Sequence, residues 1–250
     1  MAPLVTHLVV GERVFPQLWR FGAQDYSPFL LGCLLVDVNH FSDVDRRRTH
    51  FTGGIDGGGV HARNGGCANF LSQLDTVLLR PWRALMVQEQ AFVAGYLCHL
   101  AADKAWRSQI WGRLHAFGIG SMADLPVPGD VLMTAFSVLS SQKFLDFPAV
   151  VSALNDAVLP HVLAHVPYDA LRTMWVAVRP SMANGRSPEA YFEMLRRKGR
   201  SGAEIEAVRR EHDLHWEDAV TLAQDLEGIE PFICAGVRRS LDVIPRLWGA

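Results

Sequence analysis

Apolar residues recur at helical spacing along most of the chain, and no β-rich alternation of apolar and polar residues competes with it. Segment 91–106, AFVAGYLCHLAADKAW, is the clearest case, because an apolar stripe follows the 3.6-residue period and no proline interrupts it. Pro28 begins a second segment, PFLLGCLLVDV, which is apolar on every side until Asp37. The pattern therefore predicts an all-α fold, a multi-helix bundle in which these two helices are buried.

Further helices are expected from periodicity and from residues that start and stop helices. They cover 3–19, 67–79, 81–117, 130–144, 148–166, 168–178, 187–199, 202–226 and 231–248. Helix is compatible with segment 39–51, which holds His40, three consecutive arginines and His50, but the pattern does not require it. Segment 52–66 has seven glycines in fifteen residues, so we expect a loop. We interpret it as a mobile cover rather than a phosphate-binding loop, because the motif of such loops is absent.

Length and composition fit one domain over residues 1–250, with a motif-bearing part 4–106 and a helical remainder 107–250. Hydrophobic residues make up 49% and charged residues 20%, which is too hydrophobic for a disordered chain. The net charge of -2 gives no general affinity for nucleic acid, so no nucleic-acid partner is expected. The cysteines form no CxxC motif and indicate buried thiols in a reducing compartment: Cys33, Cys67, Cys98 and Cys234.

The N-terminal segment lacks the basic region and long apolar run of a signal peptide. No stretch reaches the ~18 unbroken apolar residues that a membrane span needs. We therefore expect a cytoplasmic protein without a membrane span.

His99 and Asp103 lie four residues apart within the clearest helix, so their side chains share one face. One metal ion could accept both. The alternative is a metal-free core, in which His99 is hydrogen-bonded and Asp103 meets Lys104, Arg107 or another basic group. The spacing alone does not choose between the two.

Asp37 ends an apolar helix. A charged carboxylate without a partner would cost roughly several kcal/mol there, because it loses its hydration. Five residues with suitable chemistry lie in or beside apolar helices: His7, Asp37, His50, His99 and Asp103. Imidazole and carboxylate ligands without cysteine suit zinc, iron or manganese in a site that keeps positions open for water.

Four motifs in the chain order THLVVG, FLLGCLLVDV, RRRTHF and FVAGYLCHLAADKAW resemble the zinc-dependent phospholipase C family of all-α metallohydrolases. The resemblance covers about residues 4–106, although Val36 stands where the family has a proline. It implies that His7, Asp37, His50, His99 and Asp103 are metal ligands, with Asp103 bridging two ions. It also implies that the cofactor is Zn²⁺, as one or two ions, with iron or manganese as alternatives.

A further metal of that family uses a later His, His and Glu set, for which this chain offers several candidates. They are His115, His161 with His165, and His212 with His215 and Glu217. An ordinary helical surface is the favoured interpretation of each, because exposed histidine and glutamate are common on helices. Arg46, Arg47 and Arg48 could bind a phosphate, and we name Arg47 and Arg48 as candidate substrate-binding residues, with a solvated basic turn as the alternative. Tryptophans such as Trp82, Trp106, Trp111 and Trp175 line a substrate pocket or belong to the core.

The leading hypothesis is a metal-dependent hydrolase that uses metal-activated water on a phosphoester or a related ester. Asp37 would be a ligand and the catalytic base, and the substrate a small cytoplasmic metabolite or biosynthetic intermediate. A non-hydrolytic metal enzyme, which activates oxygen or cyclises a carbonyl substrate, is one alternative. A non-catalytic helical binding protein is the other.

Overall fold

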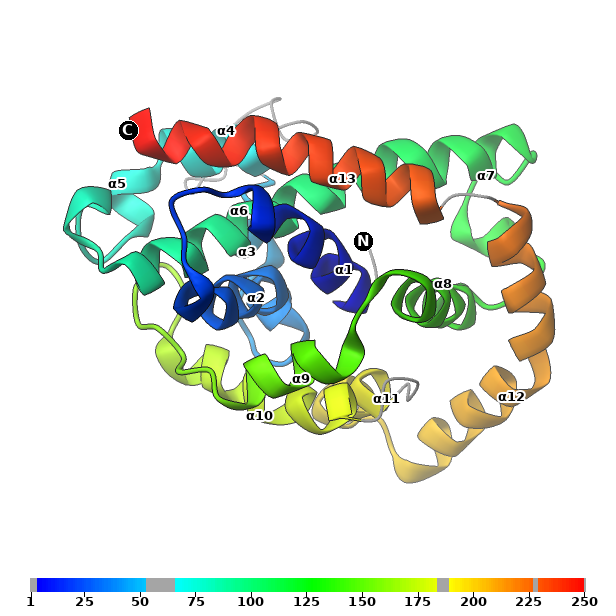
Figure 1. Ribbon diagram of the computed structural model, residues 1–250. Coiled ribbons are helices and arrows are strands. Elements are labelled where there is room, and N and C mark those ends of the chain that lie inside the picture. The colour runs from blue at the N-terminus through cyan, green and yellow to red at the C-terminus, as the bar shows by residue number, and fades with distance from the viewer. Residues whose placement is uncertain (1–3, 53–65, 184–188, 227–228, 250) are drawn as a thin grey trace.

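The computed structural model describes residues 4–52, 66–183, 189–226 and 229–249, and over these ranges the chain forms helices without an extended sheet (Figure 1). The α-helices are α1 (Leu4–Val14), α2 (Tyr26–Leu35), α3 (Arg46–His50), α4 (Gly66–Ser72), α5 (Leu74–Val77), α6 (Val87–Trp106), α7 (Gly112–Ala116), α8 (Gly129–Phe144), α9 (Phe147–Asn155), α10 (Tyr168–Ala183), α11 (Glu189–Arg197), α12 (Gly202–Asp225) and α13 (Ile229–Val243). The predicted all-α fold is confirmed.

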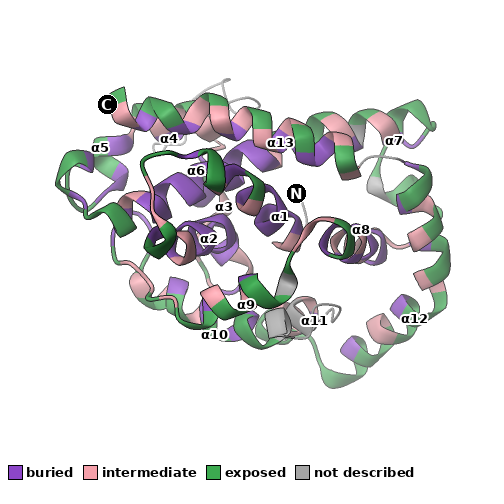
Figure 2. Ribbon diagram, in the orientation of Figure 1, coloured by how far each residue is buried: buried purple, intermediate pink, exposed green. Residues whose placement is uncertain are grey.

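Helices α2 and α6 cross at the centre of the molecule, where Figure 2 shows almost every residue buried. A Cβ on Gly32 of α2 would lie 2.0 Å from the carbonyl oxygen of Phe92, and a Cβ on Gly95 of α6 would lie 1.9 Å from that of Phe29. Only glycine at both positions lets the two backbones approach this closely. The crossing therefore fixes the end of α2 relative to α6.

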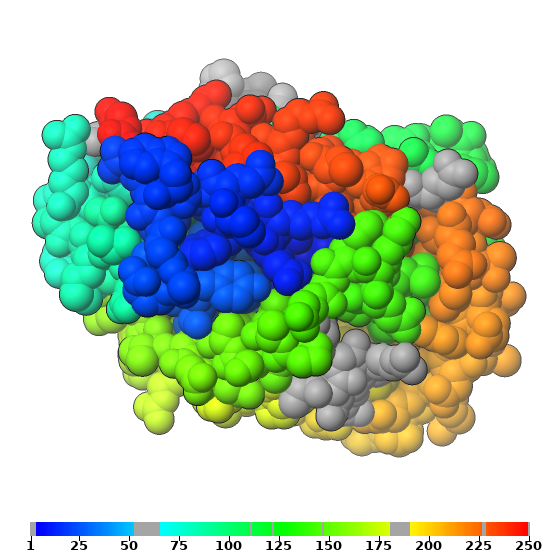
Figure 3. Space-filling view, viewed as in Figure 1, coloured from blue at the N-terminus to red at the C-terminus, as the bar shows by residue number. Residues whose placement is uncertain are grey.

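Helix α1 packs against α2 and α6, and it lies between α13 and α8 on the face that Figure 3 shows. Helix α13 runs along α6, while α12 packs on α8 at the far end of the molecule (Figure 1). The buried apolar side chains of these helices belong to one core cluster. His7 of α1 and His99 of α6 are fully buried among these helices.

The expected helix over 148–166 is wrong in its second half, because α9 ends at Asn155. Pro160 lacks a backbone N–H and disfavours helical geometry in the preceding residue. The chain instead pairs with the end of α5: the amide of Leu79 donates to the carbonyl of Val162 at 2.9 Å, and the amide of Ala164 to that of Val77 at 2.9 Å.

Two other expected helices are interrupted. Segment 67–79 divides into α4 and α5 at Gln73. Segment 81–117 begins with a 3-10 turn and becomes α-helical only at Val87, where the Glu89 carboxylate accepts from the amide of Met86 at 2.9 Å. It then passes through a π-helical turn at 107–111 before α7, and Gly118 follows α7 with a φ of +80°.

None of the helices in the described ranges is long and apolar enough to cross a membrane.

Candidate metal centre

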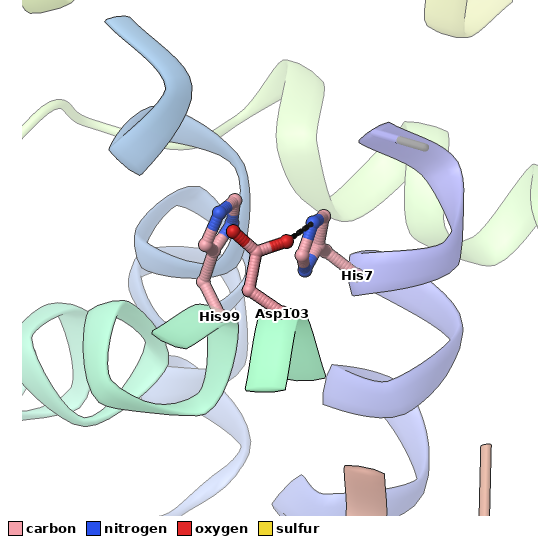
Figure 4. A group of neighbouring side chains, drawn as sticks. All are labelled: His7, His99 and Asp103. Atoms are coloured by element: carbon pink, nitrogen blue, oxygen red, sulfur yellow. Dashed lines mark ion pairs between the residues drawn. The ribbon is translucent and has the colours of Figure 1, made fainter. Parts of the chain in front are cut away.

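Five side chains from four elements meet beside the α2–α6 crossing. His7 comes from α1, Asp37 from the 3-10 turn Val36–His40 after α2, His50 from the end of α3, and His99 and Asp103 from α6. The three histidines are at most 2% exposed and Asp37 is 4% exposed, while the Asp103 side chain is 15% exposed. Figure 4 shows His99 and Asp103 projecting from α6 toward His7.

Local chain geometry places His50 and Asp37. The Asp45 carboxylate caps α3 by accepting from the amide of Arg47 at 2.8 Å, and Phe51 ends the helix with a left-handed φ of 53°. The Phe51 ring then packs on Phe70, which holds this end of α3 against the core. Asp37 has a non-helical ψ of 20°, and the chain changes direction where its carboxylate leaves the apolar helix.

The distances between imidazole and carboxylate atoms match a shared ion. His50 Nε2 lies 3.2 Å from Asp37 Oδ1 and 3.5 Å from Asp103 Oδ2, and His7 Nε2 lies 3.6 Å from Asp103 Oδ1. His99 Nε2 lies 3.8 Å from Asp37 Oδ2. Ligands about 2.1 Å from a tetrahedral zinc ion are about 3.4 Å from one another. The separations therefore need little adjustment to accept an ion.

Two of the imidazoles are held by their other ring nitrogen. His99 Nδ1 lies 2.7 Å from the carbonyl oxygen of Cys33, and His50 Nδ1 lies 2.8 Å from the hydroxyl oxygen of Thr49. A carbonyl accepts only from a protonated nitrogen, so Nδ1 of His99 carries the proton and Nε2 keeps its lone pair. This arrangement is the usual support of a metal-binding histidine.

The atoms that face the middle of the cluster are buried, and apart from the 3.2 Å contact between His50 Nε2 and Asp37 Oδ1 they have no hydrogen-bond partner within the described structure. They are Nε2 of His7, His50 and His99, together with Oδ1 of Asp37. They fall into two overlapping groups, His7–His99–Asp103 and Asp37–His50–His99, in each of which the ligand atoms lie within 4.8 Å of one another. Buried polar atoms are rarely left in this state, so the cluster has the donor set of a metal site.

The rings of His7 and His99 stack with their centroids 3.6 Å apart and an interplanar angle of 9°. Burial lowers the pKa of His7 to about 3, and the nearby His99 lowers it as well. Burial also lowers the pKa of His99, although Asp37 and Asp103 act in the opposite direction. Both rings are therefore neutral near pH 7, as metal ligation requires.

The two carboxylates are charged despite their environment. Burial would raise the pKa of Asp37, but His99 and His50 hold it below its usual value. Burial would likewise raise the pKa of Asp103, which His99 and His7 lower. The cluster thus combines two anionic carboxylates with the neutral imidazoles of His7 and His99.

Arg46 and His40 adjoin the cluster. Arg46 donates from Nη2 to Asp103 Oδ2 at 3.2 Å, with its side chain 35% exposed, so it is a basic partner of the kind that the metal-free alternative requires. His40 Nε2 lies 3.8 Å from Asp37 Oδ1. Sequence reasoning named Arg46 only as part of the arginine run that could bind a phosphate, and it gave His40 no role. The i, i+3 spacing of Asp37 and His40 could have indicated the second.

Arg47 lies away from the cluster. Its side chain is 72% exposed and donates through Nε and Nη2 to Asp45 at 2.9 and 2.7 Å. Arg48 is exposed, and its charge lowers the pKa of His165. Substrate binding by Arg47 and Arg48 stays a prediction.

The later histidines do not join the cluster. His161 and His165 lie outside any helix; His161 is exposed beside Tyr168, and His165 is buried with Nδ1 3.3 Å from the Val77 carbonyl. His212 is buried and contacts Asp130 of α8 at 3.3 Å. His115 and Glu217 are exposed and His215 is half-buried. In the part of the chain that is described, none of these belongs to a three-residue ligand group.

Trp82, Trp106 and Trp175 are buried in the core, while the Trp111 side chain lies outside the described structure. Most of the expected glycine-rich cover, residues 53–65, also lies outside the described ranges.

No protein-family model, curated protein sequence or solved structure matches this chain.

Proposed function

We propose that the cluster binds a divalent metal ion and that the protein is a metal-dependent hydrolase acting on a phosphoester or a related ester. One observation carries the proposal: Nε2 of His7 and of His99 is buried without a hydrogen bond in the described structure, and both belong to the ligand groups that also hold His50, Asp37 and Asp103. An unsatisfied buried polar group costs about 1–3 kcal/mol, so these nitrogens destabilise a cluster without an ion. An ion that accepts these lone pairs offsets that cost.

The donor chemistry supports zinc, with iron or manganese as alternatives, because imidazole and carboxylate ligands suit all three. One or two ions are compatible with the two ligand groups. Because Nδ1 of His99 faces the Cys33 carbonyl, only its Nε2 is available, and His99 serves a single ion. A second ion would then depend on His7 and on a carboxylate, Asp37 or Asp103, that bridges both.

Bound zinc lowers the pKa of a coordinated water to ~7, which supplies hydroxide at neutral pH. Asp37 would serve as ligand and base. Of the three consecutive arginines, Arg46 contacts a proposed ligand, Asp103. Its guanidinium group suits the oxygens of a phosphoester. The four motifs that resemble the zinc-dependent phospholipase C family support the same reaction class. A small cytoplasmic metabolite or biosynthetic intermediate remains the proposed substrate.

A metal-free polar core is the competing explanation, and the Arg46–Asp103 and His99–Cys33 contacts favour it. The 3.2 Å contact between His50 Nε2 and Asp37 Oδ1 fits such a core as well. A metal-free core would be expected to pair its other buried atoms too, whereas the Nε2 atoms of His7 and His99 make no hydrogen bond with any described residue. A metal enzyme that is not a hydrolase would have the same ligands, so the reaction must be tested separately from the metal.

The test begins with elemental analysis of the protein purified without chelator. We expect zinc, iron or manganese in the wild type and in His161→Ala, which changes an exposed histidine, and loss of the metal in His99→Ala. The metal-loaded protein is then assayed on aryl phosphomonoesters and phosphodiesters, with loss of hydrolysis on chelation and recovery with zinc or manganese expected. A metal-free wild type would overturn the metal site. A metal-loaded protein that hydrolyses no ester would overturn the hydrolase and leave the site intact.

A further inference from the structure

We propose that a pocket between α4, α6 and α13 binds a small oxyanion such as phosphate. The pocket has a volume of about 250 Å³. Its polar lining comprises Lys104 of α6, Arg239 and Asp242 of α13 and Arg246 of the following 3-10 turn Ile244–Gly249. Cys67 and Ala101 belong to its remaining lining.

The pocket and the candidate metal centre occupy different faces of α6. Ala101 and Lys104 are three residues apart and share one face, while His99 and Asp103 are four apart and share another. At 100° per residue, Ala101 points about 180° and Lys104 about 120° away from the mean direction of His99 and Asp103. The proposed anion site is therefore separate from the cluster and does not depend on the proposed function.

The charges around the pocket favour an anion. Three cationic side chains face it with one carboxylate, Asp242. Lys104 and Arg239 form no ion pair with a carboxylate of the described residues. Arg246, in contrast, donates from Nε to the backbone carbonyl of Asp242 at 3.3 Å. Two cations thus remain available for a ligand.

Cys67 indicates that these two cations converge. Burial raises the pKa of its thiol to about 12, and the charges of Lys104 and Arg239 both act in the opposite direction. Both cations therefore lie near the same half-buried thiol, which lines the pocket with them. The apolar part of the lining, Leu71 and Ala101 among it, excludes water on that side, which strengthens the attraction for an anion.

The volume argues for a small ligand. Pockets for drug-sized molecules are about 300–1,000 Å³, and this pocket lies just below that range. Phosphate, or the phosphate group of a small monoester, matches both its size and its positive lining. A guanidinium group can donate two parallel hydrogen bonds to two oxygens of a phosphate.

Calorimetric titration of the metal-loaded full chain with inorganic phosphate at fixed ionic strength tests the proposal. We expect saturable binding that weakens about tenfold or more in Lys104→Ala and in Arg239→Ala, since each removes a charged hydrogen bond. Arg238→Ala is the matched control, because this neighbouring arginine lines a different groove with Arg13, and it should bind as the wild type does.

His99→Ala separates this pocket from the metal centre. Phosphate binding that persists in His99→Ala and is weakened by Lys104→Ala supports the proposal. Binding that is lost in His99→Ala and unchanged in Lys104→Ala and Arg239→Ala places phosphate at the metal centre and overturns it, as does the absence of saturable binding. Lys104 is exposed, so its variant should keep the fold even where Arg239→Ala does not. Titration with glycerol phosphate shows whether the ligand is a free phosphate ion or the phosphate group of a small monoester. Glycerol phosphate that binds more tightly than phosphate indicates a monoester, and equal affinity indicates the free ion.

Discussion

Gly95 of α6 lies against Phe29 of α2 so closely that a Cβ at Gly95 would come within 1.9 Å of the Phe29 carbonyl oxygen. Gly32 makes the reciprocal approach to α6. The two helices therefore touch through their backbones, where no side chain can adapt to an added atom. Because Asp37 follows α2 and His99 belongs to α6, this contact also sets the distance between two proposed ligands.

Gly95→Ala should lower the free energy of unfolding by about 3 kcal/mol or more, because the two backbones must separate to admit a methyl group. Urea denaturation followed by circular dichroism measures the change. Gly112→Ala is the control: no atom lies within 4 Å of its added Cβ, and alanine at this helical position should stabilise by up to about 1 kcal/mol. Equal effects of the two substitutions would contradict the close contact.

The sequence predicted most of the helices and five side chains that the structure brings together, because helical period and isolated polar residues in apolar segments are local signals. Asp37 at the end of an apolar helix and the i, i+4 pair of His99 and Asp103 are of this kind. The contact of Arg46 with Asp103 joins residues 57 positions apart, and the contact of His99 with Cys33 joins residues 66 apart. Such contacts depend on how helices pack, which periodicity does not specify.

The second half of the expected helix over 148–166 failed for a related reason. Its apolar residues fit a helical pattern, and the spacing of His161 and His165 favoured the same interpretation. Pro160 and the backbone pairing with residues 77–79 decided the outcome instead. A tertiary contact thus overrode a local preference, and with it the two histidines lost the common face that a ligand pair would need.

Arg46→Ala should lower kcat/KM for a phosphomonoester by about 10–100-fold, because a charged hydrogen bond to the substrate is worth about 1.5–3 kcal/mol. Metal content should be retained, since no proposed ligand is removed. Arg47→Ala tests the other candidate from the arginine run: it removes the same charge one residue away, and because its exposed side chain pairs with Asp45, the loss should be smaller than that of Arg46→Ala. Steady-state kinetics of both variants, with elemental analysis, measures the difference. Equal losses would assign the effect to the basic turn as a whole.

His165 should make the protein less stable in acid. Burial lowers its pKa from 6.5 to about 4, with a weaker lowering by Arg48, while the Val77 carbonyl opposes the shift. Between these two values the unfolded chain binds a proton that the folded chain does not, so stability falls as the pH decreases through this window. The full loss from this group is about 3 kcal/mol.

His165→Gln should therefore lose less stability than the wild type between about pH 7 and pH 4. Urea midpoints across that range measure the difference, in which any contribution from metal release cancels. His161→Gln, which changes an exposed histidine, should follow the wild type. Parallel pH profiles for the wild type and His165→Gln would show that protonation of His165 does not change the free energy of unfolding.

Asp37→Asn should depress turnover by ~10²-fold or more while leaving much of the metal bound. Asparagine keeps an oxygen 3.2 Å from His50 Nε2 but removes the negative charge and the base that would take a proton from metal-bound water. Asp37→Ala removes the oxygen as well, so it should lose both metal and turnover. Elemental analysis paired with initial rates, measured in the same preparation, separates the two roles. A fall in turnover that only matches the fall in metal content of Asp37→Asn would make Asp37 a ligand without a role as base.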